Sequence, residues 1–301
     1  MCVINQSSIS PANSPQVFDS SDGSWYIHMS AASRILSRIK RSASSSQQIS
    51  FLESWMKYHK VLAEFSHCSG SLPDMSMPNL PSEAEENTKV LSQTYGPFCR
   101  MCSYQSQIVG SLGCSMQVLE CISCINQLSK ITKGTQYHKM PLDIILLVEE
   151  LQIQLEALRQ APAIIEVDTY SRIDQNKIHK TAELYRLAAL IYLHRSVLST
   201  PQVSPVMKKL VSKSISILTE LEVCTSPWPL FLTACELLDD EQRVTILNVI
   251  EKMQTERRIA NVETIRCIIE GVWKSTDLIG GSERVDWKTM IGDNERMPSF
   301  I

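Results

Sequence analysis

The segment Tyr185-Arg-Leu-Ala-Ala-Leu-Ile-Tyr-Leu-His-Arg195 decides the fold of this 301-residue chain. It lies within 178–199, a stretch that is apolar almost all round when it is read as a helix. Such a helix has no polar face to give to water and belongs at the centre of a helical protein. Its densest apolar part, Ala188–Leu193, is far shorter than the roughly 18–20 apolar residues that a membrane span needs. We therefore expect a buried central helix and no membrane segment.

Other segments repeat apolar residues at spacings of three or four, the period of an amphipathic helix. Helices are predicted at about 24–42, 49–65, 107–131, 141–160, 246–253 and 262–273, with a short helical piece near 86–98. In 107–131 the predicted stripe begins at Ile108 and Leu112, and in 141–160 it includes Leu142 and Leu146. These residues are accordingly expected to face the core.

Clear start signals mark the helices of the C-terminal third. Pro205 stands where proline favours the first position of a helix. The run Thr225-Ser226-Pro227-Trp228-Pro229 combines possible capping hydroxyls with prolines before the apolar run Leu230–Leu238. Asp239-Asp240-Glu241 places carboxylates at the next start, where the helix dipole favours negative charge.

These patterns predict an all-α fold, an irregular multi-helix bundle or solenoid-like stack in one large domain. The chain has only 10 glycines, and alternating β-branched runs are scarce, which argues against sheets and phosphate-binding loops. Residues 1–22 have too few apolar side chains to fold and are expected to be disordered. Residues 24–301 form the domain, with a loop at 66–85 because Pro73, Pro78 and Pro81 cannot sustain a helix.

The composition, 44% hydrophobic and 20% charged, is that of a globular protein. The formal net charge of −3 gives no electrostatic reason to expect a nucleic-acid surface. No secretory signal is recognised at the N-terminus, so the chain is expected inside the cell. The ten cysteines are accordingly expected to be free thiols.

One cysteine series resembles a zinc site in its spacing. Cys99 and Cys102 form one CxxC unit, and Cys121 and Cys124 form another after Cys114. The last three cysteines are spaced by seven and three, which places them beside an Ile/Leu stripe as small buried hydrophobes. We therefore predict no metal site here.

Catalytic patterns are equally weak. Asp239-Asp240 suggests the aspartates of isoprenoid enzymes, but Glu241-Gln242-Arg243 does not complete a DDxxD pattern, and helix capping explains the acids better. No pair of residues suited to general acid–base catalysis stands out among the histidines, and His194 is expected to be packed or to cap a helix. We predict no enzyme activity and no cofactor.

Several separated segments, in order, resemble the helical regulatory domain of fungal zinc binuclear cluster transcription factors over roughly 24–300. The residues that carry the resemblance are Trp25, Gly113, Cys114, Tyr185, Arg186, Tyr192, His194, Arg195, Trp228, Pro229, Arg243, Trp273, Asp286 and Trp287. Read physically, they are architecture: Trp228 and Pro229 fix a helix entry, and Trp273 and Trp287 pin the last helices to the core.

In the family that the chain resembles, a six-cysteine zinc module reads DNA and the helical domain behind it regulates activity through protein contacts. This sequence has no such module, so direct DNA binding is not expected. Either the DNA-reading part lies upstream, or the chain is a stand-alone regulatory domain that acts through a partner. The resemblance implies a nuclear regulator that contacts other transcription proteins or a DNA-binding partner, and it is compatible with a homodimer. The alternative is an all-α small-molecule-binding protein or an isoprenoid-type enzyme.

Overall fold

The computed structural model describes residues 31–36, 38, 47–67, 106–110, 112–133, 137–162, 172–257, 260–279, 285–292, 298 and 300. Within these residues the helices are α2 (Gln47–His67), α4 (Met116–Ile131), α5 (Leu142–Ala157), α6 (Arg172–Ser196), α7 (Pro205–Glu220), α8 (Pro227–Ala234), α9 (Asp240–Arg257), α10 (Ala260–Leu278) and α11 (Trp287–Gly292), with one 3-10 turn at Tyr137–Lys139. The fold is all-α, as predicted.

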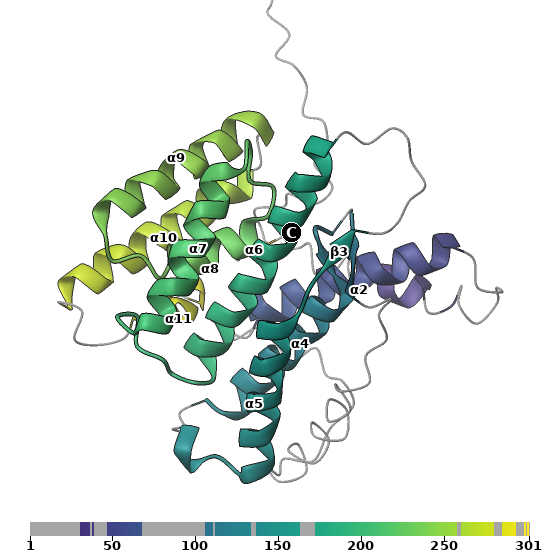
Figure 1. Ribbon diagram of the computed structural model, residues 1–301, viewed down its shortest axis with the longest axis horizontal. Helices are drawn as coiled ribbons and strands as arrows, with labels where there is room; N and C mark the ends of the chain where they lie inside the picture. The colour runs from purple at the N-terminus through teal and green to yellow at the C-terminus, as the bar shows by residue number, and fades with distance from the viewer. Residues whose placement is uncertain are drawn as a thin grey trace, which may run out of the picture.

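The central helix is α6, which contacts α4 and α5 on one side and α7 and α8 on the other. Figure 1 shows it running through the middle of the molecule, with α7 to α11 on one side and α2, α4 and α5 on the other. Every residue from Leu184 to Leu193 is buried, and the most exposed of them, Arg186, is 8% exposed. The fold is therefore an irregular bundle organised around the second half of α6, which is buried on all sides.

Start signals in the sequence locate several of these helices correctly. Pro205 occupies the first turn of α7, and the Ser204 hydroxyl accepts a hydrogen bond from the Met207 amide at 3.2 Å. The Asp239 carboxylate accepts one from the Gln242 amide at 3.0 Å at the start of α9. Ser226 precedes α8, but its hydroxyl makes no capping bond, so the prolines and not the hydroxyl define that start.

The predicted helix at 107–131 is wrong in its first part. Gln107–Val109 is strand β1 and Cys114–Ser115 is strand β2, paired antiparallel, and β3 (Ala161–Pro162) lies parallel to β1 on its other edge. Gly113 turns the chain into β2 with a φ of 74°, a conformation that few L-residues adopt. Cys114 thus lies on a strand, and the helix begins only after Ser115, whose hydroxyl accepts a bond from the Val118 amide.

Gly113→Ala is expected to lower the free energy of unfolding by about 1–2 kcal/mol from the left-handed backbone alone. A further cost follows because the added Cβ would lie 2.9 Å from the Cγ2 atom of the buried Thr181. Gly110→Ala is the matched control, since nothing lies within 4 Å of its added Cβ. Urea unfolding of both variants checks this, and equal stability of the two would contradict the strain assigned to Gly113.

Some sequence predictions lie outside the described residues. The helix predicted at 24–42 is described only at 31–36 and 38, where the chain is helical. The loop predicted at 66–85 is wrong at residues 66 and 67, which belong to the last turn of α2, and its remainder lies outside the described residues. The segments predicted as disordered at 1–22 and as a helical piece at 86–98 also lie outside them. None of the described helices is long and apolar enough to cross a membrane.

Candidate functional site

An aromatic cluster at the centre of the bundle brings together three of the residues singled out in the sequence. Phe65 of α2 lies at its middle, with ring centroids 5.2 Å from Tyr192, 5.8 Å from Trp228 and 5.0 Å from Trp287. Phe231 and Phe300 complete the cluster. Trp228 and Trp287 are only 0% and 2% exposed. Both tryptophans are buried as expected, and their role in holding the helices together stays a prediction.

A second aromatic group joins this cluster to the small sheet. The Tyr185 ring stacks on Trp228 at 6.0 Å, and its hydroxyl lies 2.7 Å from the Tyr58 hydroxyl. Burial raises the pKa of both phenols above the ordinary value, so both stay protonated. A Cβ on Gly113 would lie 3.5 Å from the Tyr185 ring, so the glycine lets the turn approach α6 closely.

Asn126 of α4 connects three helices through its side chain. Its Nδ2 donates to the Val61 carbonyl of α2 at 3.0 Å, and its Oδ1 accepts from the Tyr192 hydroxyl of α6 at 3.0 Å. Asn126 is fully buried, and a buried amide costs stability unless its groups are bonded. These two bonds hold α2 and α4 in place against α6.

A buried ion pair joins α6 to the end of α8. The Arg195 Nε lies 2.5 Å from a carboxylate oxygen of Glu236, and the two side chains are only 2% and 1% exposed. Arg195 Nη2 also donates to the Val285 carbonyl at 3.2 Å. Since a buried charge is tolerated only when it is paired, each member of this pair requires the other.

Arg243 forms a second polar junction, near the molecular surface. It donates two bonds of 2.8 Å to the Asp277 carboxylate, and its guanidinium carbon lies 5.5 Å from the centre of the Trp273 ring. The Trp273 Nε1 donates to the Ala234 carbonyl at 2.8 Å. The bidentate contact lowers the pKa of Asp277 and raises that of Arg243. Helices α8, α9 and α10 are connected at this point.

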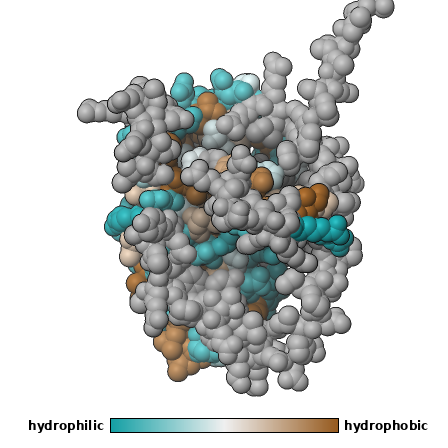
Figure 2. Space-filling model, turned by 90° about the vertical axis from the view of Figure 1, so that its right-hand side faces the viewer, coloured by the Kyte–Doolittle hydropathy of each residue, from teal (hydrophilic) through white to brown (hydrophobic). Residues whose placement is uncertain are grey.

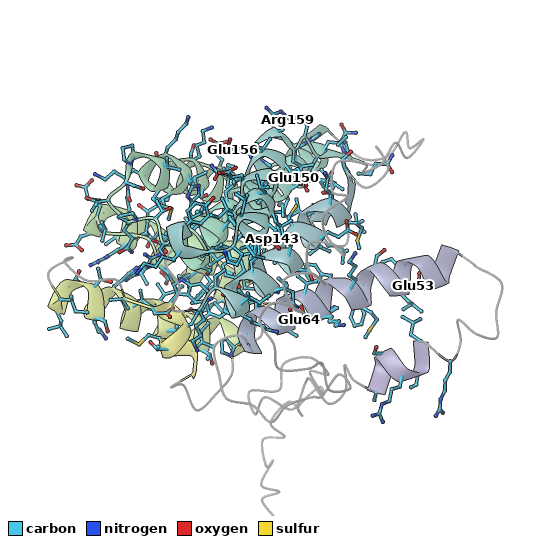
Figure 3. All side chains as sticks on the ribbon, turned by 90° about the horizontal axis from the view of Figure 1, so that it is seen from below. Glu53, Glu64, Asp143, Glu150, Glu156 and Arg159 are labelled. Carbon is cyan, nitrogen blue, oxygen red and sulfur yellow. The ribbon has the colours of Figure 1, made fainter. Side chains whose placement is uncertain are left out.

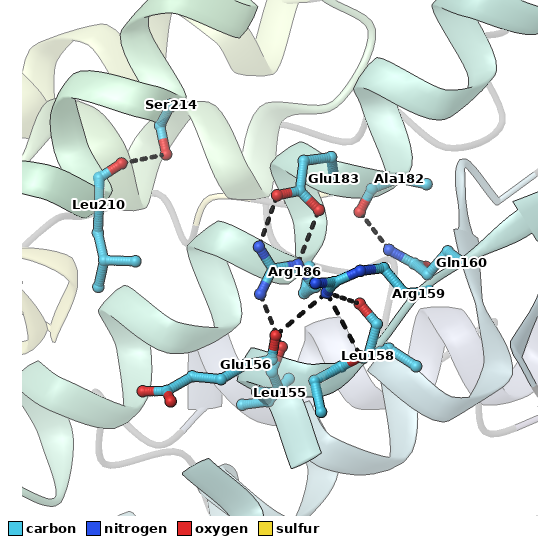
Figure 4. A network of polar contacts seen from close by, with 11 residues as sticks. Leu155, Glu156, Leu158, Arg159, Gln160, Ala182, Glu183, Arg186, Leu210 and Ser214 are labelled. Atoms are coloured by element: carbon cyan, nitrogen blue, oxygen red, sulfur yellow. Dashed lines mark hydrogen bonds and ion pairs between the residues drawn. The ribbon is translucent and has the colours of Figure 1, made fainter. Parts of the chain in front are cut away.

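Figure 4 shows the contacts of Arg186 on α6. Its guanidinium binds both carboxylate oxygens of Glu183 and donates to the Leu155 carbonyl at 2.7 Å. That carbonyl belongs to the last turn of α5, where backbone acceptors lack helical donors. Arg186 therefore holds the C-terminal end of α5 against α6.

The remaining predicted residues have local structural contacts. His194 is 6% exposed and its Nδ1 lies 2.9 Å from the Thr200 hydroxyl, while burial lowers its pKa. Asp286 is exposed, and its carboxylate accepts a bond from the Lys288 amide in front of α11. Pro229 is buried in the first turn of α8. Trp25 lies outside the described residues.

The cysteines of the predicted stripe are packed as apolar groups. Cys114, Cys121 and Cys124 are 0%, 1% and 0% exposed. Burial raises the pKa of Cys121 to about 12 and moves the other two in the same direction, so these thiols stay protonated and unreactive. They are free thiols. Cys99 and Cys102 lie outside the described residues.

The two aspartates that suggested an isoprenoid-type enzyme lie at the start of α9. Asp239 caps α9, and Asp240 pairs with Arg243 at 3.1 Å, so both acids of the suspected motif serve the helix start. In the ranges that the structure describes, no three His, Cys, Asp or Glu residues are grouped to hold a metal ion.

A shallow cavity of about 220 Å³ lies between α7 and α9. Leu218, Cys224 and Val249 form its apolar floor, and Glu222 and Lys252 stand at its rim. The rim carries one acid and one base, in contrast to the convergent, buried titratable groups typical of a catalytic pocket.

Sequence reasoning missed the partners of the predicted residues. Phe65, Asn126, Glu236 and Asp277 complete the contacts described above. A usable signal existed for Glu236 alone, since it is the one charged residue in the apolar run 230–238. A carboxylate in such a run predicts a buried pair, although not which arginine forms it.

A family model described as "Fungal specific transcription factor domain" matches residues 1–301. Transcription factor iacI of Pestalotiopsis fici is 26% identical over 262 residues, which cover 85% of this chain and 60% of that protein. The chain thus matches little more than half the length of this relative. No solved structure matches the chain significantly.

Proposed function

This chain belongs to the fungal-specific transcription factor domain family, and from that premise we propose that it regulates transcription in the nucleus through contacts with other proteins. The observation that carries the proposal is the family match over residues 1–301. The residues on which the resemblance rests support it, because those described form a scaffold of buried rings, caps and ion pairs. A rigid scaffold of this kind holds its exposed surfaces in a fixed shape. The domain then regulates transcription through the proteins that bind to those surfaces.

We assign DNA recognition to a partner or to a separate zinc module and not to residues 1–301. The supporting observations are the formal charge of −3 and the lack of a six-cysteine basic module in the printed sequence. The alternative of an all-α isoprenoid-type enzyme is less well supported, since the two aspartates that suggested it cap a helix and pair with Arg243.

The test is a tethered reporter assay with the whole chain fused to an unrelated DNA-binding domain. We expect the fusion to change reporter output relative to the DNA-binding domain alone, and a gel shift with the unfused chain to show no sequence-selective binding. A nuclear signal for a fluorescent fusion is expected as well. The proposal fails if the folded fusion leaves the reporter unchanged, or if the unfused chain selects a DNA sequence.

A further inference from the structure

Helix α5 is apolar on two opposite faces, and only one of them is used inside the molecule. Ile144, Leu147, Val148, Leu151 and Leu155 are buried against the bundle. On the other side Leu142, Leu146 and Ile153 are 70%, 56% and 65% exposed. The sequence pattern had placed Leu142 and Leu146 in the core, which is wrong. Figure 2 shows apolar atoms at the surface at the lower end of the molecule, where α5 lies in Figure 1.

The exposed aliphatic residues lie on one side of α5 as two pairs, Leu142 with Leu146 and Ile153 with Ala157. With 3.6 residues per turn, positions 142, 146, 153 and 157 fall on the same side of the helix. Leu142, Leu146, Ile153 and Ala157 occupy these positions. Aliphatic side chains gathered on one exposed helix face are costly to leave in water, and burial by a partner would remove that cost.

Carboxylates border this stripe on both sides. Asp143 and Glu150 flank one edge, and Glu149 and Glu156 flank the other, by the same helical geometry. Figure 3 shows Asp143, Glu150 and Glu156 succeeding one another along α5. Helix α5 contains no Lys or Arg, and none of the four acids forms a salt bridge with a basic side chain in the described part of the chain.

The basic side chains next to α5 lie near its ends, and Arg186, which donates to the Leu155 carbonyl in the last turn, is one of them. Lys139 is exposed just before α5, and Arg159 just after it donates to the carbonyls of Glu156, Ala157 and Leu158. The centre of the stripe therefore remains acidic. Pairing with a second copy of α5 would place four acids against four acids, which like-charge repulsion disfavours.

We propose that the outer face of α5 (Leu142, Leu146, Ile153 and Ala157 with the four flanking acids) is a docking surface for an amphipathic helix of another protein. The partner helix carries an aliphatic stripe flanked by Lys or Arg, so that its stripe covers the α5 stripe and its basic side chains meet the acids. This inference rests on the proposed function, because it names the partner class through which a regulatory domain without its own DNA contact acts.

The test uses two labelled 18-residue designed helices with the same Leu stripe, one flanked by Lys and the other by Glu. Each labelled helix is titrated with the whole chain, and binding is measured by fluorescence anisotropy. We expect the Lys-flanked helix to bind and the Glu-flanked helix to bind at least tenfold more weakly. Leu146→Ser with Ile153→Ser is expected to weaken binding by about tenfold or more, because two aliphatic contacts are lost. Val244→Ser, at an equally exposed position on α9, is the control and leaves the affinity unchanged.

A charge exchange distinguishes charge-specific docking from nonspecific hydrophobic binding. Glu149→Lys with Glu150→Lys is expected to reverse the preference, so that the Glu-flanked helix binds better. Equal binding of both helices, or an affinity unaffected by the Leu146/Ile153 double change, overturns the proposal. A dimer in sedimentation that the same double change dissociates also overturns it, because the occupant is then a second copy. If peptide docking fails while the tethered chain still changes reporter output, the docking surface is wrong and the regulatory function stands.

Discussion

Trp228→Ala is expected to lower the free energy of unfolding by about 3–5 kcal/mol, the usual cost of truncating a buried aromatic side chain. The ring is 0% exposed and contacts Phe65, Tyr185 and Tyr192. Its loss removes ring contacts of α8 with α2 and α6 and leaves a cavity in the core. In a domain of this size the melting temperature falls by on the order of 10 °C.

Two comparisons make this result specific. Trp273→Ala is expected to have an effect of similar size, because the change removes a buried ring together with its Nε1 hydrogen bond to the Ala234 carbonyl. Phe51→Ala removes a ring that is 49% exposed and should cost less than about 1 kcal/mol. If both tryptophan variants melt at the wild-type temperature, the assignment of these rings to the structural core is wrong.

Glu236→Ala is the second change with a large expected effect, about 3–5 kcal/mol, because it leaves the Arg195 guanidinium buried without its carboxylate. The replacement of both charges at once, by Arg195→Met with Glu236→Leu, is expected to recover most of that loss. Removing one member of a buried ion pair leaves the other charge buried without a partner, whereas removing both members leaves no buried charge.

Chemical unfolding monitored by circular dichroism distinguishes these cases. Glu222→Ala removes an acid at the exposed rim of the α7–α9 cavity and is the matched control, with an expected change below about 0.5 kcal/mol. An effect of Glu236→Ala no larger than that of the control would show that the pair contributes nothing to stability. A double variant less stable than the single one would show that the charges have a favourable role beyond mutual neutralisation.

The sequence predicted best where the structure depends on neighbours along the chain. Pro205, Asp239 and the apolar run around Ala188 act within one or two helical turns, and the helices they predict are present. The tryptophans were correctly predicted to be buried, because burial of a large ring removes a large apolar area from water. For the same reason the thiols of α4 were correctly predicted as packed groups.

The errors come from segments whose local pattern fits more than one structure. Residues 107–115 satisfy a helical spacing, but Gly113 turns the chain and β1 pairs with β3, some 50 residues later. Leu142 and Leu146 continue the apolar period of α5, yet they point to water because Ile144, Leu147 and Leu151 fill the side facing the bundle. The pattern gives the helix and its period, and the neighbouring elements select which face is covered.

The amino-acid sequence by itself determined the helical class, the central position of α6, several helix starts and the resemblance to a transcription-factor family. Each of these depends on local spacing or on residue order along the chain. Only the tertiary structure decided that Arg195 pairs with Glu236, that Asn126 connects α2, α4 and α6, and that α5 keeps an acid-bordered aliphatic stripe exposed. Those features depend on contacts between residues far apart in sequence, and such contacts exist only once the helices have packed.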